Sequence, residues 1–227
     1  MTVSPSSLVR ASGAAAIAAG TLFVGVQLGH PPLDTTSITT TEMAVRNSLK
    51  VLMAVLALVG ITGMYLSQVR RNGVVGLVGY LVLAAGYLLI TSSTFALGYV
   101  LPPLAETEPA FVGNVLATFT GDAAAGDVGV LGTLFQLQSA CYLSGGLVFG
   151  IALYRAHVLA RWAAVLLAVG GLVSAVLALM PDALYRLIAF PNGIALIGLG
   201  YSLWRTSRQA DARPVAVEDR PGRTAVR

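Results

Sequence analysis

Nine polar or charged side chains lie within or beside strongly apolar segments, and their types and positions could support chemistry. A polar group in hydrocarbon is costly, so such a residue is expected to face a ligand, a cavity or another helix. The nine are Gln27, His30, Arg46, Asn47, Lys50, Ser92, Gln136, Gln138 and Asn192. The cationic Arg46 and Lys50 favour an anionic group, so the set predicts a site for a small molecule or a lipid headgroup. The alternative is that these side chains only form hydrogen bonds between helices, each contributing about a kcal/mol or less.

The sequence contains no arrangement of residues that predicts catalysis, a metal site or a cofactor. The one cysteine, Cys141, permits neither an intramolecular disulfide nor a cysteine-based metal site. The two histidines, His30 and His157, are expected at opposite membrane surfaces, so a single haem could not use both. No acidic residue lies inside an apolar segment, which leaves neither a partner for an intramembrane serine nor a carboxylate for proton-coupled transport. Catalytic residues are therefore not predicted, and enzymatic activity is an open and weaker alternative.

The composition indicates a membrane protein. Of the 227 residues, 56% are hydrophobic and only 11% are charged, whereas soluble domains carry about a quarter charged residues. A helix needs roughly 20 apolar residues to cross about 30 Å of hydrocarbon. Six segments reach this length without the alternation of barrel strands, which predicts an all-α membrane protein with a bundle of six transmembrane helices. The segments are Ala11–Gly29, Val51–Val69, Val74–Leu101, Gly129–Tyr154, Trp162–Met180 and Ala183–Trp204.

The distribution of charge predicts the orientation of these helices. With six crossings, one side collects eleven of the basic residues and three acidic ones, while the other has three basic and seven acidic residues. Basic residues near helix ends favour the cytoplasm. The side with Arg10, Arg70, Arg71, Arg155 and Arg161 is therefore expected to be cytoplasmic, together with both termini. The nine polar residues then lie mostly in the outer half of the membrane.

The connections between the apolar segments carry their own signals. The proline pairs at 31–32 and 102–103 are expected to end the first and third helices, because proline removes a hydrogen-bond donor. Thr39 with Glu42 predicts a capping box before the second helix, and Asp182 is expected to cap the last one. A short amphipathic helix is predicted in the outer loop between the third and fourth helices, from apolar residues at helical spacing. These are Phe111, Val112, Val115, Leu116 and Phe119.

The chain divides into a transmembrane domain, residues 1–205, and a basic tail, residues 206–227. The tail is polar and nearly free of large apolar residues, so it is expected to be disordered and cytoplasmic. The first apolar segment ends without a small-residue cleavage site, so it is expected to remain as a helix and not to be removed as a signal peptide.

Two stretches resemble small, uncharacterised bacterial membrane proteins that are grouped as domains of unknown function. They are ALYRAHVLARWAA, from Ala152 to Ala164, and GLGYSLWR, from Gly198 to Arg205. The Gly29-His30-Pro31 ending of the first helix is also similar. Members usually have proline where this chain has Ala160. The resemblance covers about a third of the chain, supports the multi-pass architecture, and carries no functional residues.

The sequence thus predicts a multi-pass protein of the bacterial plasma (inner) membrane. The favoured function is a small-molecule or lipid binding or sensing module, or an accessory subunit, with an outward-facing polar pocket. The alternative is a transporter of a small or amphiphilic solute, which would also need a polar path through the inner half. The expected partners are the lipid bilayer, a second copy or another membrane protein, and no nucleic acid. No cofactor is expected.

Overall fold

The computed structural model describes residues 4–177 and 189–211, and this part of the chain is helical and contains no strand. The elements follow the chain in the order α1 (Pro5–Gly25), η1 (Ser37–Thr39), α2 (Thr41–Leu66), α3 (Val69–Phe95), η2 (Ala96–Val100), α4 (Leu101–Thr107), α5 (Pro109–Thr120), α6 (Val130–Ala156), α7 (Arg161–Leu177) and α9 (Ala189–Asp211). The η1 segment is a 3₁₀ turn, whereas η2 is π-helical.

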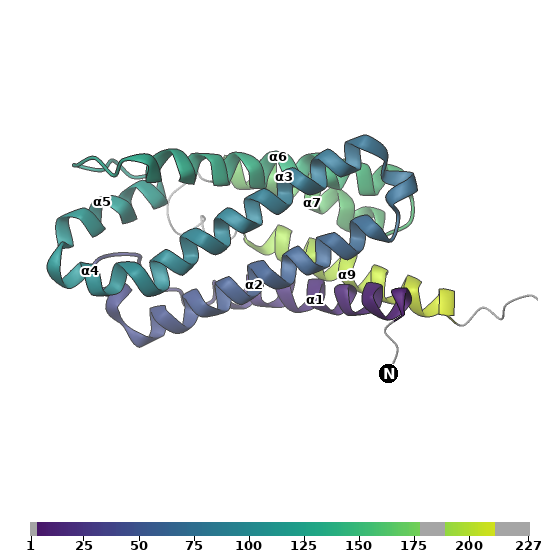
Figure 1. Cartoon of the computed structure of the whole chain (residues 1–227), viewed down its shortest axis with the longest axis horizontal. Coiled ribbons are helices and arrows are strands. Elements are labelled where there is room, and N and C mark those ends of the chain that lie inside the picture. The colour runs from purple at the N-terminus through teal and green to yellow at the C-terminus, as the bar shows by residue number, and fades with distance from the viewer. Residues whose placement is uncertain (1–3, 178–188, 212–227) are drawn as a thin grey trace, which may run out of the picture.

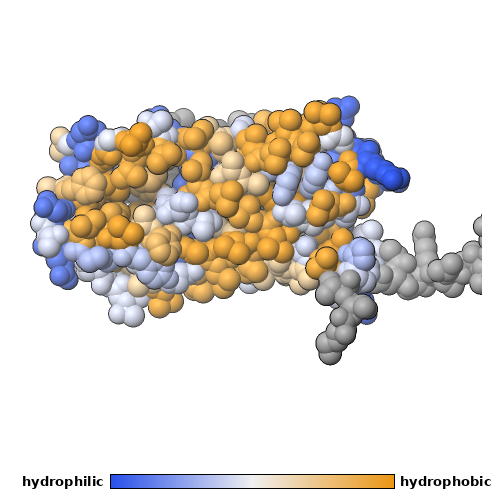
Figure 2. Space-filling model, in the orientation of Figure 1, coloured by the Kyte–Doolittle hydropathy of each residue, from blue (hydrophilic) through white to orange (hydrophobic). Residues whose placement is uncertain are grey.

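Four described helices are long and apolar enough to cross a membrane, which indicates a membrane protein. They are α1, α2, the continuous stretch from α3 through η2 to α4, and α6. Apolar residues cover most of the visible surface between the two ends of the bundle, and hydrophilic residues gather toward those ends (Figure 2). Helices α7 and α9 overlap the last two predicted segments and border residues 178–188, which the structure does not describe. The count of six crossings stays a prediction.

The long helices form a closed ring in which each packs against two neighbours (Figure 1). Helix α1 contacts α2 and α9, α3 contacts α2 and α6, and α7 contacts α6 and α9. Inside this ring lies one apolar core that includes Met53, Ile61, Leu83, Phe149 and Leu199. Short connections join α2 to α3 and α6 to α7, so these neighbours in the ring are also neighbours in sequence.

Glycines allow α1 and α9, which are far apart in the sequence, to pack with their backbones in contact. A Cβ atom added at Gly13 would lie 2.8 Å from the carbonyl oxygen of Gly200, closer than such atoms approach. About two helical turns further along α1, Gly20 contacts Gly193 of α9 in the same way. Small residues permit this close approach where no larger side chain fits, and close approach is a main source of attraction between helices in lipid.

The ends of the helices differ from several of the sequence predictions. Helix α1 ends at Gly25, before the first proline pair. The second pair does not end a helix, because Pro102 and Pro103 stand in the first turn of α4, where their missing donors are not needed. The π-helical η2 joins α3 to α4. The cap of α2 is Thr40 and not Thr39, since the Thr40 hydroxyl accepts from the backbone N–H of Met43 at 3.3 Å.

The segment between α3 and α6 contains helix α5, whose buried residues join a second, smaller apolar cluster. Val112, Val115 and Leu116 pack with Ile38 and with residues of η2 and α4. Its location on the outer side of the membrane stays a prediction. Helix α9 includes residues 206–211, the first part of the predicted tail. Residues 212–227 and the predicted cap Asp182 lie outside the described residues.

Candidate functional site

The predicted polar residues lie on a bundle with two distinct ends. At the α2–α3 end lie the start of α1, the α2–α3 and α6–α7 connections and the end of α9 (Figure 1). The α4–α5 end carries the end of α1, η1, the start of α2, and helices α4 and α5 (Figure 1). Of the predicted residues, Gln27, His30, Arg46, Asn47 and Lys50 lie toward this second end.

Arg46 holds the end of α1 in place. Its Nη1 donates to the carbonyl of Val26 at 2.9 Å and to that of Leu28 at 3.1 Å. Its Nη2 donates to the carbonyl of Gly29 at 3.0 Å, and the guanidinium also forms an ion pair with Glu42 at 2.9 Å. The last carbonyls of a helix lack partners within the helix. Arg46 therefore supplies donors to the cap of α1 at Val26 and to the turn that follows it. Its guanidinium, which the sequence assigns to an anionic ligand, already has these partners.

Lys50 and His30 meet one turn further along α2. The Lys50 Nζ lies 2.8 Å from the His30 Nε2, and the His30 Nδ1 lies 2.7 Å from the carbonyl oxygen of Pro31. A carbonyl oxygen only accepts, so Nδ1 carries the proton and Nε2 accepts from the Lys50 ammonium. Within the described part of the chain, Lys50 has no ion pair with a carboxylate. The Lys50 ammonium therefore contacts an imidazole ring and keeps further N–H donors for another acceptor.

Asn47 adds an unpaired donor on the same side of α2. Its side chain is 2% exposed, and its Nδ2 has no hydrogen-bond partner among the described residues. Asn47 precedes Lys50 by three residues, a spacing that places two side chains on one helical face. The side chain packs against Gly98 of the π-helical η2, and π-helical turns frequently occur at functional sites. A hydrogen bond of 2.6 Å between Ser48 and Tyr99 further fixes η2 to α2.

The Asn47–Lys50 face is thus one turn of α2 that carries a buried, unpartnered donor and a cationic group. An uncharged acceptor or an anion fits this chemistry, whereas a cation does not. Across the described residues, no group of three His, Cys, Asp or Glu side chains is arranged to hold a metal ion.

The remaining predicted residues are distributed over other parts of the bundle. The Gln138 Oε1 accepts a hydrogen bond from the Ser93 hydroxyl at 2.7 Å, which joins α6 to α3. Asn192 is 2% exposed and packs against Gly170 of α7. Gln27 is half-buried after the end of α1. Ser92 and Gln136 are exposed, and the Ser92 hydroxyl donates to the carbonyl of Leu88 in its own helix. A pocket lined by all nine residues stays a prediction.

A groove of about 580 Å³ lies between the end of α1 and the start of α2. It is mainly apolar, and of the nine predicted residues it includes Arg46. Its lining residues are Thr21, Leu22, Gly25, Val26, Leu28, Thr41, Glu42, Val45, Arg46 and Leu49. An acyl chain or another narrow apolar group fits such a lining, with the Arg46–Glu42 ion pair at one edge.

Several buried polar residues were not among the predicted site residues. The hydroxyls of Tyr87 and Tyr142 are buried without a hydrogen-bond partner among the described residues, and their rings meet edge to face at 5.6 Å. Gln68 and Asn72 are likewise buried near the α2–α3 end with unpartnered side-chain atoms. The tyrosines occur in apolar segments where aromatic residues are common, so the sequence offers no signal that their hydroxyls lack partners.

No protein-family model, curated protein or solved structure matches the chain. Its description rests on the structure, which shows an all-helical membrane protein with a donor-rich face on α2.

Proposed function

We propose that this protein is a six-span protein of the bacterial inner membrane that binds a small molecule or lipid with an anionic or acceptor-rich group. The binding site is the Asn47–Lys50 face, and the function is that of a binding or sensing module or an accessory subunit. Both termini and the arginine-rich α2–α3 end face the cytoplasm, so the site opens from the outer half of the membrane. The observation that carries this proposal is the unpaired, buried donor of Asn47 one turn from the Lys50 ammonium.

Energetics support a ligand at this face. A buried donor without a partner costs about 1–3 kcal/mol, and a hydrogen bond to a charged group contributes about 1.5–3 kcal/mol. A carboxylate, phosphate or carbonyl oxygen placed between Asn47 and Lys50 would remove the cost of the unpartnered Asn47 donor. It would also gain a charge-assisted hydrogen bond from Lys50. Arg46 then has a supporting role, because its donors already bind the end of α1.

Native mass spectrometry of the full-length protein in mild detergent tests the proposal. Molecules retained from the native membrane are expected as discrete mass additions on the wild-type protein. Lys50→Met is expected to lower their occupancy about tenfold or more, because a charge-assisted hydrogen bond is lost. Asn47→Leu is expected to lower occupancy while leaving stability equal or higher, since it removes an unpaired donor.

The matched control is Gln136→Leu, an exposed residue of the predicted pocket that lies away from α2. Occupancy is expected to be unchanged in this variant. Equal retention by the wild type and the Lys50→Met and Asn47→Leu variants would contradict the proposed site. A loss in Gln136→Leu equal to that in Lys50→Met would favour the wider pocket that includes all the predicted residues.

A transporter is the second candidate, favoured by the distribution of unpartnered polar groups. Asn47 lies toward the α4–α5 end, Asn72 toward the α2–α3 end, and Tyr87 and Tyr142 lie between them along α3 and α6. Such groups could form a polar path if the helices separate. In a Cys141→Ala background, transport predicts that the reactivities of Asn47→Cys and Asn72→Cys toward maleimide change in opposite directions when a bound molecule is removed. Unchanged reactivity of both cysteines would contradict the transporter and favour a protein that binds its ligand without transporting it.

A further inference from the structure

The α2–α3 connection forms a basic groove that the proposed function does not use. The groove has a volume of about 430 Å³ and is lined by Leu66, Ser67, Gln68, Val69, Arg70, Arg71 and Val158. Gly73 makes its shape possible. With φ of 56° and ψ of −159°, Gly73 interrupts α3 after one turn, a conformation that residues with a Cβ atom rarely adopt. Arg70 and Arg71 thereby stand on a separate turn, apart from the apolar length of α3.

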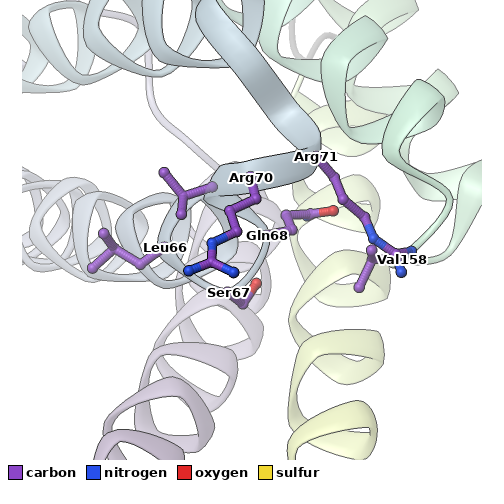
Figure 3. A pocket seen from close by; sticks show the side chains of 7 residues that line it. Leu66, Ser67, Gln68, Arg70, Arg71 and Val158 are labelled. Atoms are coloured by element: carbon purple, nitrogen blue, oxygen red, sulfur yellow. The ribbon is translucent and has the colours of Figure 1, made fainter.

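The two arginines flank a buried amide (Figure 3). Arg70 extends toward Ser67, whereas Arg71 extends toward Val158 of the α6–α7 connection, and Gln68 lies between them (Figure 3). Both arginines are exposed, and neither guanidinium has a hydrogen-bond or ion-pair partner within the described residues. Two such cations side by side favour an anion with several oxygens, such as a phosphodiester.

Gln68 supplies a second, independent observation. It is 4% exposed, its Nε2 donates to the carbonyl of Met64 at 3.2 Å, and its Oε1 has no partner among the described residues. Because Oε1 only accepts, a donor group on a bound molecule would pair with it, while the arginines attract an anionic group. A phosphodiester whose headgroup carries a hydroxyl satisfies both requirements.

The position of the groove favours a membrane lipid as the source of such a phosphodiester. It lies where the apolar helices α2 and α3 end, which is the depth of lipid headgroups for helices that cross a membrane. Its apolar rim is open, since Leu66 is 60% and Val69 is 44% exposed. We infer that the groove binds an anionic phospholipid with a hydroxyl-bearing headgroup, of the phosphatidylglycerol type. Arg70 and Arg71 bind the phosphate, Gln68 accepts from the headgroup hydroxyl, and Leu66 and Val69 contact the acyl chains.

Lipid titration of the delipidated full-length protein, followed by native mass spectrometry, tests the inference. The probes are phosphatidylglycerol and phosphatidylethanol, two anionic diesters of which only the first has a headgroup hydroxyl. The wild type is expected to prefer phosphatidylglycerol by roughly fivefold, from one net hydrogen bond. Gln68→Leu is expected to remove this preference. The Arg70→Gln, Arg71→Gln double variant is expected to weaken both lipids by about fivefold for each arginine.

Arg155→Gln is the matched control, because it removes one exposed arginine at the same end of the bundle but outside the groove. Its lipid binding is expected to equal that of the wild type. The inference is overturned if the double variant binds like the wild type, or if Arg155→Gln loses as much binding per charge as the double variant. It is also overturned if soluble glycerol 3-phosphate displaces the lipid, since the groove would then recognise a free phosphate ester. Results for Lys50→Met do not bear on these outcomes, because Lys50 lies toward the other end.

Discussion

At the scale of single residues, Arg46 shows why charge in a sequence does not by itself identify a ligand site. Its position near Lys50 suggests attraction of an anion from the sequence, but in the structure its guanidinium contacts three carbonyls and Glu42. The acceptors belong to Val26, Leu28 and Gly29, in the turn that follows α1, where the backbone carbonyls need donors from elsewhere. The residue therefore stabilises the fold beside the proposed site.

This role leads to a stability prediction for Arg46. Arg46→Gln is expected to destabilise the protein by about 1.5–3 kcal/mol, because charge-assisted hydrogen bonds to the carbonyls of the turn after α1 are lost. Arg46→Lys is expected to recover only part of the loss, since an ammonium cannot bind three carbonyls in the same fork geometry. Thermal unfolding in detergent measures both. Wild-type stability of Arg46→Gln would contradict the assigned role.

Glu42 provides the control for the same contact. Its side chain is exposed, and exposed ion pairs contribute only about 0–1 kcal/mol. Glu42→Gln is therefore expected to shift the unfolding midpoint much less than Arg46→Gln. Equal shifts would mean that the ion pair, and not the carbonyl contacts, carries the stabilisation.

At the scale of elements, the sequence predicts the location of the long helices better than the residues at which they end and connect. Each predicted apolar segment overlaps a helix in the described residues, because apolar length alone is a strong signal. The joint at Pro102 and Pro103 could not be predicted, since it depends on the π-helical η2 that lets a new helix begin with proline. The N-cap of α2 is Thr40, one residue after the predicted Thr39. The sequence does not distinguish the two threonines, because the choice depends on their backbone conformation.

The arrangement of the polar residues was predictable in part, and their role as a binding site stays a prediction. The sequence places His30, Arg46, Asn47 and Lys50 at similar depth, and the structure gathers them around the start of α2. Depth does not fix the direction in which a side chain points, so Ser92 and Gln136 are exposed, while Gln138 joins two helices. The unpartnered hydroxyls of Tyr87 and Tyr142 depend on three-dimensional packing and carry no sequence signal.

The glycine contact between α1 and α9 gives a prediction at this scale. Gly200→Val is expected to destabilise the protein by about 1–3 kcal/mol or more through overpacking, because a Cβ there would lie 2.7 Å from the Gly13 carbonyl oxygen. Gly25→Ala is the control, since nothing lies within 4 Å of its added Cβ. Unfolding in detergent distinguishes them, and equal midpoints for the two variants would refute the close contact between α1 and α9.

At the scale of the whole molecule, the closed ring brings two separate chemistries to its two ends. The α4–α5 end has the donor-rich face of Asn47 and Lys50, and the α2–α3 end has the arginines at 70, 71, 155 and 161. The structure brings the α2–α3 and α6–α7 connections to one end, as the charge pattern requires of connections that share a membrane side (Figure 1). The predicted orientation of the bundle, and with it the proposed side of ligand entry, rests on this arrangement.

Cysteine accessibility in spheroplasts tests that orientation most directly. In a Cys141→Ala background, single cysteines replace Ser67, Val158 and Ala123, which keeps every arginine in place. Membrane-impermeant maleimide is expected to label Ala123→Cys in intact spheroplasts, and to label Ser67→Cys and Val158→Cys only after lysis. Labelling of Ser67→Cys and Val158→Cys from opposite sides, or of both from outside, would contradict the six-span arrangement with its arginine-rich end in the cytoplasm.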